Sequence, residues 1–350
     1  MPKDAPALER VLPRDYLRSL ALAFPLDWTV ERPYRMPAAD AGPYYIEWRP
    51  GGGPYGEEWE RAPKDSSGVI LTPGVQVYHP VRIAQYGLHS HARFCETGDA
   101  DARRAFLAQA DWFVAHARTR AGIDGCYAYE FPNPRYGVAS GWLSAMAQGE
   151  AISLLVRAAT VAGSDAYLHA ATRAAQPFSH SIENGGVVYR SGRDVFLEEV
   201  AALPASHILN GHMFALWGLL ELQRANPQPW VEELAFDATQ TLRRRLALYD
   251  AGYWSYYSLL GTRSGFRNVA VLKYHAFHIA QLRVTAALTG DGYFAATADA
   301  WQAYAKSPVC RARVLANTLA GLGPRFFTKS DRVGRGAIDL LDRLAAHKVQ

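Results

Sequence analysis

The chain repeats in form, though not in its letters. Four amphipathic helical runs begin about 64 residues apart, and a second helix follows each run after a turn or capping signal. The four runs cover residues 81–88, 144–158, 209–222 and 274–288. Helix pairs repeated along a chain stack to bury their apolar faces. The recurrence therefore predicts a mainly α fold: an incomplete α/α-barrel, or toroid, of about four helix hairpins.

The segments that join these hairpins are rich in aromatic and strand-forming residues. They cover residues 126–131, 187–199 and 252–260. Because they connect corresponding ends of successive hairpins, we expect them to share one rim of the barrel with the starts of the next helices. A rim carrying aromatic rings, carboxylates and amides suits a sugar polymer.

The N-terminal part differs from the helical part. Prolines and glycines interrupt two short strand candidates at residues 44–49 and 69–78. We expect residues 1–78 to form an N-terminal arm with short β-strands, a small β element near the mouth of the barrel. Residues 79–350 are then the α/α-barrel catalytic domain.

Composition favours an enzyme that handles anionic substrates outside the membrane. At 350 residues and 49% hydrophobic, the chain can bury a large core. It contains no run of roughly 18 apolar residues, and residues 1–18 mix charges with prolines, so we expect no membrane span and a cytoplasmic location. The net charge of +4 favours an anionic partner, but without a dense basic block we expect no nucleic-acid binding. Cys95, Cys126 and Cys310 show no disulfide or metal spacing.

Five ordered blocks resemble the glucuronyl C5-epimerase family. They are VRIAQYGL at 81–88, GWLSAMAQGEAISLLVRA at 141–158, ILNGHMFALWGLLEL at 208–222, LYDAGYWSYYSL at 248–259 and YHAFHIAQL at 274–282. The resemblance covers residues 78–304. It implies that the chain inverts C5 of D-glucuronate to L-iduronate in heparosan or heparan sulfate-type polysaccharide. It also implies an N-terminal β part, an α/α-barrel and a homodimer in which the C-terminal segment is the contact surface.

Such a reaction makes defined demands on side chains. The C5 proton lies next to a carboxylate, so donors must hydrogen-bond that group as charge builds, while a base and an acid act on opposite faces of the ring. The chemistry needs no nicotinamide, and the sequence contains no dinucleotide fingerprint, so we expect no cofactor.

The resemblance places catalytic roles on three residues. Glu199 and Tyr257 fall on the family's catalytic glutamate and tyrosine, and Tyr274 on the tyrosine that opens the last block. We expect Glu199 and Tyr257 to carry the two proton transfers, and Tyr274 to bind or assist. The sequence assigns neither Glu199 nor Tyr257 to a particular face of the sugar ring. Candidate substrate-binding residues on the rim are Gln85, Tyr86, Tyr136, Gln148, Asn210, Trp254, Lys273, His275 and His278. The two histidines have no evident third ligand, so we expect no metal.

Structural interpretations remain open for several of these residues. Tyr257 could pack or stack, and Glu199 could be a solvated carboxylate in a first helical turn. Gln85, Gln148 and Asn210 could instead cap or bridge buried helix ends. Trp217, in an apolar helix, is expected in the core, whereas Trp142 is a further candidate for sugar stacking.

Two positions depart from the animal members of the family. Val200 stands where they have a tyrosine, and Leu260 where they have an arginine. The partner of the substrate carboxylate could then come from other basic residues of the rim, namely Arg190, Arg193, Arg263, Arg267 or Lys273.

Other functions use related chemistry. A polysaccharide lyase abstracts the same proton but expels the C4 substituent, and it is the nearest alternative. A toroid glycoside hydrolase would need two carboxylates, for which Glu130 and Glu199 are the candidates. A non-catalytic carbohydrate-binding module needs no acid–base pair and is disfavoured.

Overall fold

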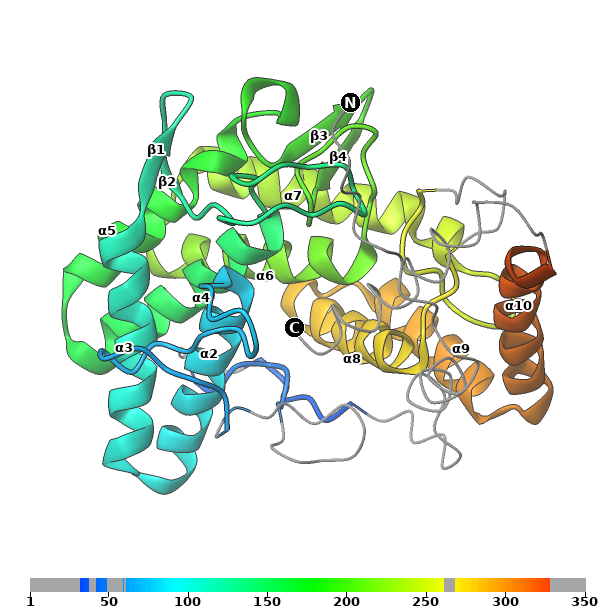
Figure 1. The fold of residues 1–350 in the computed structure, drawn as a ribbon, viewed down its shortest axis with the longest axis horizontal. Helices are drawn as coiled ribbons and strands as arrows, with labels where there is room; N and C mark the ends of the chain where they lie inside the picture. The colour runs from blue at the N-terminus through cyan, green and yellow to red at the C-terminus, as the bar shows by residue number, and fades with distance from the viewer. Residues whose placement is uncertain (1–31, 38–41, 49–58, 60, 261–267, 328–350) are drawn as a thin grey trace, which may run out of the picture.

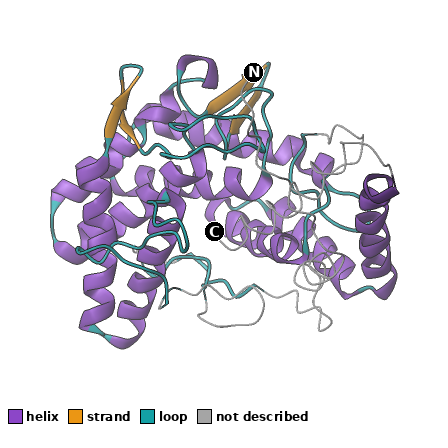
Figure 2. Ribbon diagram, in the orientation of Figure 1, coloured by secondary structure: helices purple, strands orange, loops and turns teal. Residues whose placement is uncertain are grey.

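The computed structural model describes residues 32–37, 42–48, 59, 61–260 and 268–327 (Figure 1). Over these residues the chain is mainly helical (Figure 2). The α-helices are α2 (Pro80–Thr97), α3 (Ala100–His116), α4 (Ala145–Ala162), α5 (Asp165–Ala174), α6 (Leu209–Ala225), α7 (Pro229–Arg245), α8 (Leu272–Thr289), α9 (Gly292–Lys306) and α10 (Pro308–Phe327). Three 3₁₀ turns are η2 (Gln176–Ser179), η3 (Ile182–Asn184) and η4 (Leu246–Tyr249).

The helices form the four predicted hairpins. α2 packs on α3, α4 on α5, α6 on α7 and α8 on α9. The first members also pack in series, α2 on α4, α4 on α6 and α6 on α8. The pairs follow one another from α2–α3 at the left of Figure 1 to α8–α9 at the right. This arrangement confirms the incomplete α/α-barrel that the recurrence predicts.

Local capping explains where the helices begin and end. Ser144 Oγ accepts a hydrogen bond from the Ala147 amide at 3.2 Å and so satisfies a free N–H at the start of α4. Gly163 follows the same helix with a φ of 61°, the left-handed conformation that glycine adopts without strain. The helix signals are therefore local, and sequence spacing alone could locate them.

The contact between α4 and α6 requires two glycines. A Cβ atom added to Gly149 would lie 2.5 Å from Ala215 Cα, and one added to Gly218 would lie 2.2 Å from the Gly149 carbonyl oxygen. The backbones of the two helices therefore touch, because neither glycine has a side chain. This close crossing fixes the helices whose starts carry the rim.

Two β-hairpins connect successive helix pairs. β1 (Arg118–Arg120) pairs antiparallel with β2 (Ile123–Cys126), and β3 (Val188–Ser191) pairs antiparallel with β4 (Asp194–Leu197). Both hairpins lie along the upper edge of the molecule in Figure 1. The hairpins lie in or beside the connections at residues 126–131 and 187–199. They therefore belong to the rim that these connections share.

The N-terminal segments pack against the helices. Tyr44, Ile46 and Trp59 are almost fully buried in the same hydrophobic core as the helices. The two predicted strands are reduced to isolated antiparallel bridges, one between Tyr34 and Ile46 and another between Lys64 and Ile70. A separate N-terminal unit at residues 1–78 stays a prediction, and residues 1–31 lie outside the described residues.

Candidate active site

Segments from distant parts of the sequence meet where α4, α6 and α8 begin. The Ala145 amide donates to the Glu198 carbonyl at 2.9 Å, which ties the segment after β4 to the start of α4. The Leu209 amide donates to the Tyr257 carbonyl at 3.1 Å, which ties the predicted catalytic tyrosine segment to the start of α6. The three predicted catalytic residues are thereby brought to one place.

Glu199 is buried beside the predicted tyrosine. Its side chain is 7% exposed. The Tyr257 hydroxyl donates to Glu199 Oε1 at 3.4 Å, and Asn210 Nδ2 donates to Oε2 at 3.4 Å. A Cβ on Gly211 would lie 2.5 Å from Glu199 Oε2, so α6 needs a glycine there to make room for the carboxylate. The alternative interpretation of Glu199 as a solvated residue of a first helical turn is therefore wrong.

The neighbouring glutamate has a different role. Glu198 is fully buried, and its Oε2 accepts hydrogen bonds from both the amide and the hydroxyl of Ser206 at 3.1 Å. His207 Nδ1 lies 2.5 Å from Glu198 Oε1. These bonds hold the loop between β4 and α6 against the Glu198 side chain. Glu198 is thus a structural anchor that fixes the position of the next residue.

Two phenols adjoin Glu199. The rings of Tyr257 and Tyr274 lie 4.6 Å apart between centroids. Burial, and secondly the Glu199 carboxylate, raise the pKa of Tyr257 well above its ordinary value. The same two causes raise the pKa of Tyr274. Both side chains are therefore neutral hydrogen-bond donors at neutral pH.

A cation that sequence reasoning missed lies at this cluster. The Arg135 guanidinium carbon is 6.0 Å from the centre of the Tyr257 ring and 5.3 Å from that of the Tyr136 ring. Its charge opposes the rise in pKa at both Tyr257 and Tyr274. Nothing in the segment FPNPRYG distinguishes Arg135 from an ordinary turn residue; only its place in the fold does. Tyr136, a predicted substrate-binding residue, is half-buried at the same place.

A second buried carboxyl group lies near the site. Gln85 Nε2 donates to both oxygens of Glu150, at 3.1 and 3.3 Å. Burial raises the pKa of Glu150 well above its ordinary range, while the Gln85 bond acts in the opposite direction. Gln85 is therefore bound to α4 rather than presented to solvent, and Glu150 is a residue that the sequence pattern did not indicate.

Four predicted substrate-binding residues are interior residues in the structure, which corrects their assignment. Gln148 is fully buried and bridges backbone groups of Tyr127, Gly125 and Ala174. The structure supports the alternative in which it links buried chain ends.

The other three residues with a corrected assignment form one packed group, in which His275 directly follows Tyr274 in the chain. Trp254 is fully buried, stacks on His275 at 3.8 Å and donates from Nε1 to the Ala270 carbonyl. His275 and His278 are fully buried, with Ser255 Oγ 2.8 and 2.9 Å from their Nδ1 atoms. These side chains hold the Tyr257 segment against α8 and offer no surface to a sugar.

Tyr86 and Lys273, two further predicted substrate-binding residues, each lie close to another side chain. Tyr86 is half-buried, and the Lys64 Nζ lies 5.2 Å from its ring centre. Lys273 is 7% exposed, and its Nζ lies 5.8 Å from the Phe277 ring centre. Arg190 and Arg193 are exposed at the tip of the β3–β4 hairpin, and Arg263 and Arg267 lie outside the described residues. Trp217 is fully buried, as predicted.

Val200 and Leu260, the two residues that depart from the animal pattern, are at least half-buried. Val200 is 3% exposed and packs in the core, so this position contributes no polar group. Leu260 is half-buried, and its amide donates to the Ser206 carbonyl at 3.2 Å. Glu130, the second carboxylate of the hydrolase alternative, is exposed.

The part of the chain that the structure describes has neither a metal-binding cluster nor a membrane-spanning helix. There, no group of three or more His, Cys, Asp or Glu side chains is placed to hold a metal ion. Within the same residues, none of the helices combines the length and the apolar character needed to cross a bilayer.

Comparison with known proteins identifies the family of this chain. Residues 119–303 match the family model for the D-glucuronyl C5-epimerase C-terminus. The chain belongs to the D-glucuronyl C5-epimerase family. The matched region begins within β1 and contains β2, the β3–β4 hairpin, Glu199, Tyr257 and Tyr274. The members of the cluster described above therefore all lie within the family's C-terminal region.

Two relatives of this epimerase family member match different shares of the chain. The chain is 33% identical over 218 residues to the D-glucuronyl C5-epimerase of Caenorhabditis elegans, which is 57% of this chain and 35% of that protein. It is 27% identical over 161 residues to an uncharacterized protein of Methanocaldococcus jannaschii, 45% of this chain and 52% of that protein. The chain thus spans between a third and about half of the length of these relatives.

A solved structure is similar to part of this chain. It is the unsaturated glucuronyl hydrolase of Bacillus sp. GL1, described as responsible for the degradation of glycosaminoglycan. The TM-score is 0.43 at 17% sequence identity, over 64% of this chain and 61% of that one.

Proposed function

We propose that this protein is a polysaccharide uronate C5-epimerase that converts D-glucuronate units of a heparosan or heparan sulfate-type polymer to L-iduronate. The observation that carries the proposal is the contact between the Tyr257 hydroxyl and the Glu199 carboxylate, whose oxygen atoms lie 3.4 Å apart. Both side chains are buried, and the chain belongs to the epimerase family. Acid–base chemistry needs such a pair at one place.

Glu199 accepts the C5 proton in this proposal. The C–H bond breaks, its electron pair stays on C5 and spreads into the adjacent carboxylate, and Glu199 becomes protonated. The Tyr257 hydroxyl then delivers its proton to the opposite face of C5. Its raised pKa keeps it protonated until the carbanion forms, which suits it to the acid role. Inversion requires that the two groups face opposite sides of the ring, so the bound sugar separates them.

Donors around the pair stabilise the developing charge. Arg135 lies 6.0 Å from the Tyr257 ring centre and is the cation we assign to the substrate carboxylate. Tyr274, a neutral phenol beside Tyr257, donates a hydrogen bond to the same group. Charge-assisted bonds of this kind are stronger than neutral ones and act where charge develops. Together they compensate for the phenol and the guanidinium that Val200 and Leu260 do not supply.

Incubation of glucuronate polymer in deuterated water tests the proposal. An epimerase should introduce deuterium at C5 and form iduronate while chain length stays constant. A lyase would shorten the polymer and leave an ultraviolet-absorbing C4–C5 double bond, because the C4 substituent departs before reprotonation. Unsaturated ends without label in the recovered uronate would refute the epimerase assignment.

The expected homodimer is a further part of the proposal. It rests on family resemblance, with the C-terminal segment as the contact surface. Light scattering of the purified protein should give twice the monomer mass of 38.6 kDa.

A further inference from the structure

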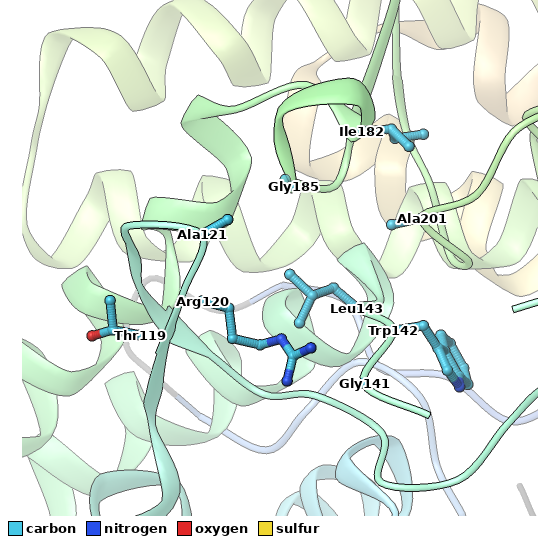
Figure 3. Close-up of a pocket in the computed structure, with 10 residues that line it drawn as sticks. Thr119, Arg120, Ala121, Gly141, Trp142, Leu143, Ile182, Gly185 and Ala201 are labelled. Atoms are coloured by element: carbon cyan, nitrogen blue, oxygen red, sulfur yellow. The ribbon is translucent and has the colours of Figure 1, made fainter. Parts of the chain in front are cut away.

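A cavity of about 460 Å³ opens on the rim beside the proposed active site. It lies between the β1–β2 hairpin, the segment that precedes α4 and the turn around η3 (Figure 3). Residues that line it include Arg120, Gly141, Trp142, Ile182, Gly185 and Ala201. The reaction proposed above uses none of these side chains.

The cavity and the active site share one piece of backbone. The Ala201 amide donates to the Leu143 carbonyl at 3.0 Å, and both residues line the cavity. Glu199 precedes Ala201 by two residues, so the two Cα atoms lie at most roughly 7 Å apart. Trp142 stacks on Tyr129 at 3.8 Å, and Glu199 contributes, after burial, to the raised pKa of Tyr129. The cavity therefore lies within the reach of a polymer that has one unit at Glu199.

Trp142 presents a fixed aromatic surface. Tyr129 covers one face of the ring with an interplanar angle of 8°, and Trp142 Nε1 donates to the Phe131 carbonyl at 2.9 Å. The side chain is half-buried, so its orientation is set before a ligand arrives. An aromatic face held this way suits the apolar C–H face of a sugar ring.

Arg120 supplies positive charge to the same cavity. Figure 3 shows its guanidinium reaching from β1 toward Gly141, where an added Cβ would lie 2.5 Å from Arg120 Nη2. Gly141 has a φ of 96°, so both its backbone and the guanidinium favour glycine there. Among the described residues no carboxylate lies within ion-pair distance of Arg120, which is exposed. Glu183, in the same turn as Ile182, does not line the cavity.

We propose that this cavity is a subsite for an anionic sugar residue that lies one or two units from the reacting uronate in the polymer. Arg120 binds the anionic group through its planar fork of donors, and Trp142 stacks on the ring. The assignment rests on the proposed function for its choice of polymer. In a heparosan-type polymer uronate alternates with glucosamine, so the anionic group is either an N-sulfate on the adjacent glucosamine or the carboxylate of the next uronate, two units away. Both groups share the recognition chemistry.

Binding measurements with defined oligosaccharides test the subsite without turnover. Titration calorimetry would compare wild type, Arg120→Ala and Arg118→Ala with a non-sulfated glucuronate hexasaccharide, its N-sulfated form and its carboxyl-reduced form. Arg118 is the matched control, because it lies on the same strand with its guanidinium bonded to the Ala115 and Ala117 carbonyls. We expect Arg120→Ala to weaken binding of the anionic ligands roughly 10-fold or more, with no effect on the carboxyl-reduced one.

The outcomes separate the subsite from the reaction. A loss with both anionic forms assigns the uronate carboxylate, whereas a loss confined to the N-sulfated form assigns the sulfate. Trp142→Ala should weaken all three ligands. Equal binding by wild type and Arg120→Ala, or no binding by wild type, would overturn the subsite. Arg120-dependent binding without deuterium exchange at C5 would refute the epimerase function and leave the subsite standing.

Discussion

Two buried clusters of this molecule contain the same residue types in different arrangements. The cluster that we propose to be catalytic, the catalytic cluster, consists of Glu199, Tyr257, Tyr274 and Arg135. The arm cluster consists of Glu221, Tyr44, Tyr45 and Arg157. Each contains one carboxylate, two phenols and one guanidinium. The arm cluster lies where the N-terminal segment packs on α4 and α6.

The two clusters differ in how the carboxylate is bonded. In the arm cluster Arg157 donates to Glu221 at 3.0 and 2.6 Å and also to the Gly42 carbonyl at 2.9 Å. In the catalytic cluster Glu199 accepts from the neutral groups of Tyr257 and Asn210 at 3.4 Å. The Glu221 carboxylate is thus held by short bonds from a charged guanidinium, whereas the bonds from Tyr257 and Asn210 to Glu199 are longer and come from a phenol and an amide. The two clusters therefore differ in how the carboxylate is bonded and not in their residue types.

The largest expected effect is on turnover in the catalytic cluster. Glu199→Gln and Tyr257→Phe should each reduce C5 deuterium exchange by about 10²- to 10⁴-fold, because each removes a positioned proton carrier. The melting temperature should stay close to that of wild type. Glu183→Gln, a change at an exposed glutamate, is the matched control. Full turnover in both variants would leave the two clusters functionally alike.

Breaking the arm cluster should cost stability instead. Glu221→Gln leaves the Arg157 charge buried without its carboxylate, which should lower the free energy of unfolding by about 3–5 kcal/mol. Urea unfolding followed by circular dichroism measures this, with the exposed Glu232→Gln as control. A stable Glu221→Gln protein that had lost turnover would reverse the roles assigned to the two clusters.

Acid should weaken both clusters through buried histidines. Burial lowers the pKa of His275, next to Tyr274, to about 3, and burial together with the Arg157 charge lowers that of His91 to about 3. Because the folded pKa lies below the unfolded value of about 6.5, the stabilisation is complete above pH 6.5 and is lost as the pH falls toward 3. The loss at pH 5 is about 2 kcal/mol for each histidine.

Variants test whether each cluster contributes its share to this acid sensitivity. The free energy of unfolding at pH 7 and pH 5 should differ less in His275→Gln and in His91→Gln than in wild type. An unchanged difference in either variant would remove that histidine from the explanation.

The smallest expected effect is the change in stability when a buried phenol of the arm cluster loses its hydroxyl, and it can be compared with the same change in the catalytic cluster. The Tyr44 hydroxyl is buried and has no hydrogen-bond partner among the described residues, while its ring stacks on Trp48 at 5.4 Å. Tyr44→Phe should therefore change the free energy of unfolding by less than about 1 kcal/mol and leave C5 exchange unchanged. Tyr257→Phe should match it in stability and differ in turnover. A large loss of activity in Tyr44→Phe would link the arm to catalysis.

Particular residues show which parts of the site could be predicted. Tyr257 and Tyr274 stand in the family blocks and Glu199 shortly before one of them, and the recurrence puts their segments on one rim. Arg135 and Glu150 have no such local pattern, so sequence reasoning missed both. Trp254 and His275 look like rim residues in the sequence, yet they stack on each other in the interior.

The sequence by itself determined the order of the helix hairpins and the places where they begin. These depend on capping residues, left-handed glycines and apolar spacing, which act within a few residues of one another. Tertiary structure decided which of two adjacent glutamates is an anchor and which faces the site, since Ser206 and His207 bind Glu198 while Gly211 makes room for Glu199. Burial and long-range bonding are properties of the assembled chain, because they arise only when distant segments pack together.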